Sequence, residues 1–168
     1  MPVSDQGVDP ARYTIIPRTL IFLTRGDAVL LLKGDSDKTI WADKYNGVGG
    51  HIEKGEGVQQ AARRELKEET GLQHQALRLV GTVTIDTGQD PGIGLYVFTG
   101  EFQGGELKPS GEGQLTWVSR DDLSRYPLVE DLSTLLPRVL EAGPGEPPFS
   151  AHYHYDEHDQ LMITFDNA

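Results

Sequence analysis

The chain has 168 residues, no cysteine and a formal net charge of −11, from 26 acidic and 15 basic side chains. This length suits one domain that buries a core unaided, and the absence of cysteine excludes disulfides, cysteine metal sites and thiol catalysis. The negative charge opposes binding to a nucleic-acid polymer, which requires Lys and Arg to neutralise phosphates, but it allows a small phosphorylated substrate.

The N-terminal segment, residues 1–11, contains Pro2, Gly7 and Pro10 and few apolar side chains, which predicts a flexible arm. It has neither the basic region nor the apolar run of a signal peptide, and no stretch of the chain is apolar enough to span a bilayer. We therefore expect a cytoplasmic protein with no membrane partner. The sequence leaves the oligomeric state open.

Two short apolar runs follow, residues 18–24 and 28–33, with Gly26-Asp27 between them. Apolar runs on either side of a Gly-Asp turn predict a buried β-hairpin. A polar loop then leads to residues 44–50, KYNGVGG, where three glycines in four positions let the backbone come close to another group. Taken alone, these glycines fit a tight turn better than a phosphate-binding loop.

The clearest helical pattern lies within residues 50–72, where apolar side chains recur at every fourth position: Val58, Ala62 and Leu66. Glu65, Glu68 and Glu69 occupy the same segment. Residues three and four apart are neighbours on a helix, so we expect these carboxylates to share one small volume and to repel one another. A hard divalent cation such as Mg²⁺ would offset the repulsion; a solvated acidic face is the alternative.

Beyond this segment, residues 77–86, 93–102 and 115–118 are predicted strands, and residues 129–141 a helix that Pro137 is expected to interrupt. The Gly/Pro-rich run at 143–148 separates that helix from a C-terminal extension, 143–168, which we expect to form a β-hairpin or flap packed on the same domain. Strands before and after the acidic helix, with a second helix late in the chain, indicate an α/β fold whose mixed sheet is covered on both faces.

The segment GHIEKGEGVQQAARRELKEETGL, residues 50–72, resembles the Nudix box. The family pattern is Gly, any five residues, Glu, any seven, Arg, Glu, an aliphatic residue, any one, Glu, Glu, any one, Gly and an aliphatic residue, and every constrained position is matched. The resemblance implies the Nudix fold over residues 12–142, an α/β/α sandwich with a mixed β-sheet and the box as a loop-helix-loop. It also implies hydrolysis of a nucleoside diphosphate linked to another group, with Mg²⁺, or Mn²⁺ in its place, as cofactor.

The resemblance further implies roles for residues of the box. The implied metal ligands are the backbone carbonyl of Gly50 and the carboxylates of Glu65, Glu68 and Glu69. One of these carboxylates, or one from another loop, is the general base. Arg64 and Glu56 are expected to pair and so hold the loop against the helix, with direct phosphate contact by Arg64 as the alternative. Glu112, ahead of a strand containing Trp117, resembles the position from which MutT-like members supply a further ligand or base, with an ordinary loop carboxylate as the alternative.

Substrate recognition must come from outside the box. Asn46, in the phrase YNGVGG, resembles the Asn that contacts the base in the family's oxidised-purine triphosphatases, and its amide can both donate and accept. Glu130-Asp131 resembles the acidic pair of those enzymes, although Leu128 stands where they place a base-stacking Trp. Charges favoured at a helix N-terminus are the alternative explanation of this pair.

The leading functional hypothesis is a Mg²⁺-dependent pyrophosphohydrolase that acts on a nucleoside triphosphate, with a purine base that includes oxidised forms such as 8-oxo-dGTP. One alternative keeps this chemistry on ADP-ribose or a dinucleoside polyphosphate. The other is a Nudix-fold module that senses a nucleotide without cleaving it, which a complete box disfavours.

Overall fold

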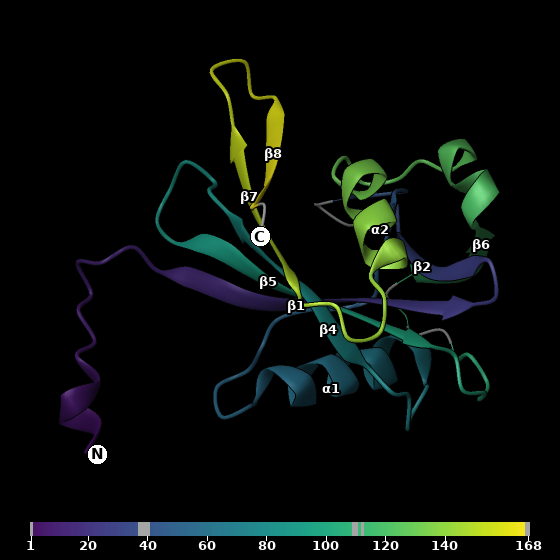
Figure 1. Cartoon of the computed structure of the whole chain (residues 1–168), viewed down its shortest axis with the longest axis horizontal. Coiled ribbons are helices and arrows are strands. Elements are labelled where there is room, and N and C mark those ends of the chain that lie inside the picture. Colours follow the sequence, from purple (N-terminus) through teal and green to yellow (C-terminus); the bar gives the residue numbers. More distant parts are fainter. Residues whose placement is uncertain (1, 37–40, 109–110, 112, 167–168) are drawn as a thin grey trace.

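The computed structural model describes residues 2–36, 41–108, 111 and 113–166. Within these ranges a mixed β-sheet lies between two α-helices, α1 on one face and α2 on the other (Figure 1). The strands are β1 (Ile15–Arg25), β2 (Ala28–Gly34), β3 (Tyr45–Asn46), β4 (Arg78–Ile85), β5 (Gly92–Glu101), β6 (Gly113–Ser119), β7 (Phe149–Tyr155) and β8 (Leu161–Asp166). The helices are α1 (Val58–Thr70) and α2 (Leu132–Glu141), with 3-10 turns η1 (Val3–Gln6) and η2 (Arg120–Arg125).

The sheet order is β3-β2-β1-β5-β4-β7-β8, and β6 pairs with β2. β1 and β5 run parallel over the whole of their shared length, whereas β1 and β2 pair only next to their turn. β2 then pairs along its whole length with β6. The segment 48–51 lies along the edge of β1 that β2 leaves, because the N–H groups of Ile21 and Thr19 donate to the carbonyls of Val48 and Gly50 at 2.7 and 2.8 Å. The start of the Nudix box is therefore held by the central strand.

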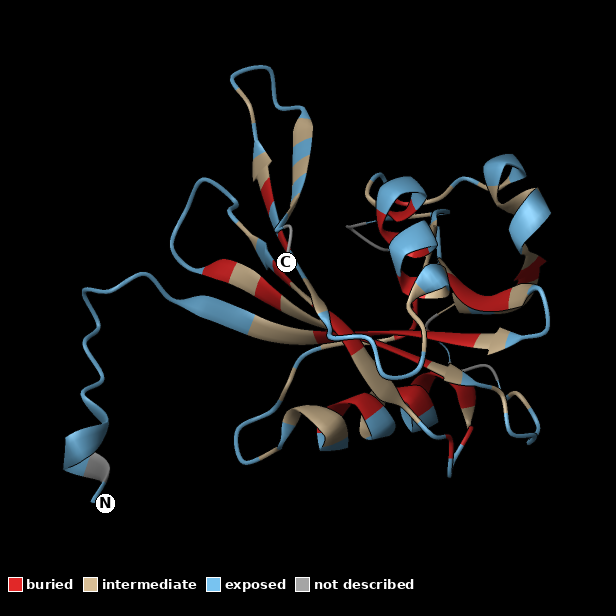
Figure 2. Cartoon of the chain, viewed as in Figure 1, coloured by how far each residue is buried: buried red, intermediate tan, exposed pale blue. Residues whose placement is uncertain are grey.

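Side chains of β1 alternate between two hydrophobic clusters, as the period of a β-strand requires. Leu20 and Phe22 join the α2-side cluster, and Ile21 and Leu23 join the α1-side cluster. Burial is concentrated on these strands and on the inner faces of both helices (Figure 2). The α2-side cluster includes Leu132, Leu135, Leu136, Val139 and Tyr153; the α1-side cluster includes Val48, Ala62, Leu66, Leu72 and Phe98. This arrangement confirms the expected α/β/α sandwich.

Helix α2 differs from its prediction at two points. It begins at Leu132 rather than near residue 129, because the N–H of Val129 donates to the carbonyl of Tyr45 at 3.0 Å and so belongs to a pairing with β3. The helix also continues through Pro137 without the expected break. Buried side chains on either side of that position, Leu136 before it and Val139 after it, hold the helix against the sheet, and this packing outweighs the hydrogen bond that proline removes.

The C-terminal residues extend the same sheet. β7 pairs in parallel with β4, starting at Gly81 and Phe149, and β8 pairs antiparallel with β7. Residues 2–14 lead away from the sheet at the opposite end of the chain (Figure 1). The domain limits at residues 12 and 142 stay predictions. No helix in the described ranges is both long enough and apolar enough to cross a membrane.

Candidate active site

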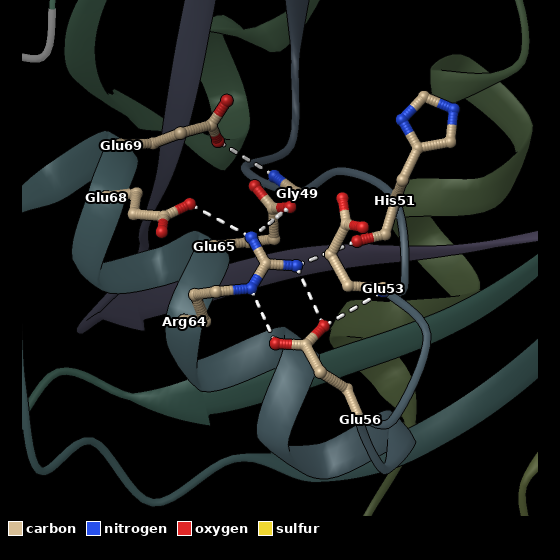
Figure 3. A network of polar contacts seen from close by, with 8 residues as sticks. All are labelled: Gly49, His51, Glu53, Glu56, Arg64, Glu65, Glu68 and Glu69. Atoms are coloured by element: carbon tan, nitrogen blue, oxygen red, sulfur yellow. Dashed lines mark hydrogen bonds and ion pairs between the residues drawn. The ribbon is translucent and has the colours of Figure 1, made fainter.

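Helix α1 carries the acidic side chains of the candidate site. Glycines bound it: Gly57 precedes it in an extended conformation, and Gly71 ends it with φ 75° while its N–H donates to the carbonyl of Lys67. Ala62 and Leu66 are buried against the sheet. Docking of this apolar stripe fixes the rotation of the helix, so its carboxylates face the loop formed by residues 49–56 (Figure 3).

Arg64 is the centre of a polar network in this loop (Figure 3). Its Nε and Nη2 donate to the two carboxylate oxygens of Glu56 at 2.6 and 3.0 Å, a bidentate pair. Its Nη1 donates to Glu65 at 2.7 Å and to Glu68 at 2.9 Å, and Nη2 also donates to the carbonyl of His51 at 2.9 Å. One guanidinium therefore joins the loop to two carboxylates of the helix.

The charges in the network stabilise one another. Hydrogen bonds from Arg64, and then from the backbone N–H of Glu53, lower the pKa of Glu56 below its usual range. Hydrogen bonds to Glu56 and then Glu65 raise the pKa of Arg64 above its usual range. Arg64 and Glu56 are thus both ionised at neutral pH. The structure contains the salt bridge between them that the family resemblance implies.

Two glycines let the carboxylates approach the backbone. The N–H of Gly49 donates to Glu69 at 2.8 Å, and Glu69 is only 7 % exposed. The Glu65 carboxylate packs on Gly50 so closely that a Cβ built there would lie 2.6 Å from its carboxylate atoms. A Cβ at Gly49 would lie 2.1 Å from the carbonyl oxygen of Thr19. A side chain at residue 49 would therefore collide with the backbone of β1, and one at residue 50 would displace the Glu65 carboxylate.

The carboxylates of Glu65, Glu68 and Glu69 lie on one side of α1, but they do not converge on one point. Among the described residues no group of three or more His, Asp or Glu side chains is arranged to hold a metal ion. Arg64 lies between Glu65 and Glu68 and binds one oxygen of each, while Glu69 is directed to Gly49. The expectation of three carboxylates repelling one another in one volume was incomplete, because Arg64 already offsets part of their charge.

The residues predicted to recognise the base come from distant parts of the chain. The N–H of Tyr45 donates to Pro127 at 2.8 Å and its carbonyl accepts from Val129, which brings Asn46 next to the segment containing Glu130 and Asp131. The side-chain oxygen of Asn46 accepts from the N–H of Gly47 at 2.7 Å. Glu130 is exposed. Glu112, the predicted further ligand, lies outside the described residues.

Asp131 has an unexpected neighbour in Tyr153 of β7. The Tyr153 hydroxyl is buried, and it interacts electrostatically with the Asp131 carboxylate without meeting hydrogen-bond geometry. Burial raises the pKa of Asp131, and burial next to Asp131 raises that of Tyr153. Sequence reasoning missed Tyr153, and also the backbone groups of Gly49 and His51; only the cluster of glycines gave a signal for the close approach at Gly49.

Comparisons with known proteins identify the same fold and family. The family model of the NUDIX domain matches residues 15–139. The oxidized purine nucleoside triphosphate hydrolases of Danio rerio and Mus musculus are 28% and 27% identical over 145 residues, covering 86% of this chain and 89% of each relative. The crystal structure of the MutT protein from Bacillus halodurans aligns with a TM-score of 0.74 at 25% identity, covering 90% of this chain and 98% of that one.

A sandwich of this topology, with a complete box on α1, defines a Nudix domain. The chain belongs to the Nudix family and is a Nudix hydrolase. Members of the family generally act on small nucleotide substrates with a divalent metal ion. The Nudix domain of Shewanella oneidensis NrtR, solved in complex with ADP ribose, shares the fold with a TM-score of 0.67 at 18% identity, covering 84% of this chain and 98% of that one.

Proposed function

We propose that the protein hydrolyses a purine nucleoside triphosphate, including oxidised forms such as 8-oxo-dGTP, to the monophosphate and pyrophosphate. The observation that carries the proposal is the acidic side of α1, where Glu65, Glu68 and Glu69 face the loop at Gly49-Gly50. Similarity to oxidized purine nucleoside triphosphate hydrolases over 86% of the chain supports the substrate class. Such free nucleotides fit a cytoplasmic location.

The donor groups on this side fit Mg²⁺, with Mn²⁺ as a substitute. Both ions favour oxygen ligands, and Gly50 leaves space for the Glu65 carboxylate where any other residue would place its Cβ. The residues that would hold the ion are Glu65, Glu68, Glu69, Gly50 through its carbonyl, and Glu112. A bound Mg²⁺ neutralises charge on the diphosphate and favours attack by water.

Side chains and backbone groups of the protein position the reacting groups and accept a proton. Water attacks phosphorus, its proton passes to a carboxylate of this acidic side, and the bond to the bridging oxygen breaks to release pyrophosphate. Arg64 and Glu56 keep the loop fixed on α1 through their bidentate pair. Gly49 orients Glu69 by its N–H. Carboxylates held in this way need little reorganisation during the reaction.

Recognition of the base is assigned to Asn46, Glu130 and Asp131. The side-chain oxygen of Asn46 is engaged locally, which leaves its NH₂ group to donate to a purine acceptor. Burial raises the pKa of Asp131, and we assign this carboxyl group a hydrogen bond with the edge of the purine. Exposed Glu130 accepts from purine N–H groups.

The test is a product analysis with Mg²⁺ and a panel of 8-oxo-dGTP, dGTP, dCTP, ADP-ribose and a dinucleoside polyphosphate. We expect monophosphate and pyrophosphate from the purine triphosphates, and a higher KM for them in Asp131→Asn and Asn46→Ala variants. Turnover of ADP-ribose or the dinucleoside polyphosphate with none of the triphosphates would replace the proposed substrate. Turnover without any added divalent ion would overturn the cofactor.

A further inference from the structure

Arg18 of β1 lies beside the candidate site. Its side chain is partly buried, and its Nε donates to Nε2 of His51 at 3.2 Å. Within the described residues it makes no ion pair, whereas Lys33 pairs with Asp43 and Arg64 with Glu56. The guanidinium therefore keeps its positive charge without a carboxylate to offset it within the described residues.

The sheet places Arg18 directly beside the start of the Nudix box. Arg18 and His51 form an antiparallel bridge, and the neighbouring N–H of Thr19 donates to the carbonyl of Gly50 at 2.8 Å. The carbonyl of His51 in turn accepts from Arg64. Arg18 is therefore one residue pair away from Gly50 and joined through His51 to the network of α1.

Side-chain alternation places Arg18 on the other side of this backbone from Glu65. Arg18 has the same parity along β1 as Leu20 and Phe22, so it projects to the α2 side, where Asp131 and Tyr153 lie. A Cβ on Gly50 would instead meet the Glu65 carboxylate on the α1 side. Arg18 therefore lies beside Gly50, on the face of the sheet that carries Asp131, while Glu65 lies on the other face.

His51 prepares the guanidinium for such a ligand. Nε of Arg18 donates to Nε2 of His51, and this bond fixes the orientation of the guanidinium. The ring of His51 points away from the carboxylates (Figure 3). This bond uses one edge of the guanidinium, and both Nη groups remain for a planar, two-point contact with phosphate oxygens.

We propose that Arg18, oriented by His51, binds the phosphate chain of the substrate where it passes from the base-binding side to the acidic helix. The inference rests on the proposed function, because it takes a nucleoside triphosphate as ligand. Arg18 supplies positive charge from the protein itself, in addition to that of Arg64.

The experiment measures binding of an α,β-imido analogue of dGTP with Mg²⁺, and of deoxyguanosine, to wild type, Arg18→Gln and Arg18→Lys. Because charge-assisted hydrogen bonds to phosphate are strong, we expect Arg18→Gln to weaken binding of the analogue by about 10-fold or more. Arg18→Lys restores part of that loss, and deoxyguanosine affinity stays unchanged because it has no phosphate. Arg12→Gln, which removes an exposed arginine of the N-terminal segment, is the matched control and binds both ligands as wild type does.

Two outcomes separate this inference from the proposed function. If Arg18→Gln binds the analogue within about 2-fold of wild type while triphosphates are still hydrolysed, the inference fails and the proposed function stands. If the wild-type protein hydrolyses no triphosphate, but Arg18→Gln lowers the affinity for the analogue, the proposed function fails and the phosphate contact stands. Equal losses for deoxyguanosine and the analogue would show a general disturbance of the site and overturn the assignment.

Discussion

Replacing Gly50 by Ala tests whether the position of the Glu65 carboxylate limits activity. A Cβ at residue 50 would lie 2.6 Å from Cδ and both oxygens of Glu65. Non-bonded contacts relax near about 3.5 Å, so the carboxylate must retreat by about 1 Å. Its 2.7 Å hydrogen bond from Arg64 is then strained or lost.

The expected consequence is a loss of activity with little loss of stability. A misplacement of about 1 Å at a reacting centre costs about 100-fold in rate, which corresponds to about 2.7 kcal/mol in the barrier. The clash involves only the end of a flexible side chain, and residue 50 does not have a left-handed φ, so the stability change stays below about 1 kcal/mol. The assays are triphosphate turnover with Mg²⁺ and thermal unfolding.

Gly57→Ala is the matched control within the same box. A Cβ at residue 57 meets no atom within 4 Å, and φ there is −81°. This variant should keep wild-type turnover. Activity of Gly50→Ala within about 3-fold of the control would refute the reasoning, because a displaced Glu65 would then be tolerated. A Gly50→Ala protein that no longer folds would contradict the claim that only the carboxylate moves.

Three further predictions concern the same network. Arg64→Lys cannot maintain its contacts to Glu56, Glu65 and Glu68 together, so turnover should fall by about 10-fold or more; unchanged turnover would show that the network has no catalytic role. Because the pKa of Glu56 is lowered on folding, its contribution to stability is complete above the ordinary value of 4.5 and is lost as pH falls through the lower folded-state pKa. In urea unfolding from about pH 6 to about pH 3, wild type should therefore lose more stability than Glu56→Gln, and parallel losses would contradict this. Glu69→Gln keeps an acceptor for the N–H of Gly49, so it should fold normally while turnover is abolished; near-wild-type activity would remove Glu69 from the metal ligands.

Local patterns account for the parts of this structure that the sequence predicts. The spacing of Val58, Ala62 and Leu66, with glycines on either side, is contained in one helix and depends on no distant partner. The Gly26-Asp27 turn likewise joins β1 and β2 as predicted. The pairing of Arg64 with Glu56 follows from the box because the two residues are near in sequence and complementary in charge.

Contacts between distant segments account for what the sequence does not reveal. The bond from Gly49 to Glu69 and the contact between Arg18 and His51 depend on the segment 48–51 lying along β1, which no periodicity encodes. The proximity of Tyr153 to Asp131 depends on the place of β7 beside β4. The continuation of α2 through Pro137 depends on tertiary packing.

The place of β7 also has a consequence for the order of folding. Tyr153 is among the largest fully buried side chains, and it belongs to the same cluster as Leu20 of β1 and Leu135 of α2. That cluster cannot close during synthesis until residue 153 has emerged from the ribosome. The β1–β5 pairing also joins residues far apart in sequence, which slows folding. Until then the nascent chain exposes apolar side chains of its central strands, which favours aggregation.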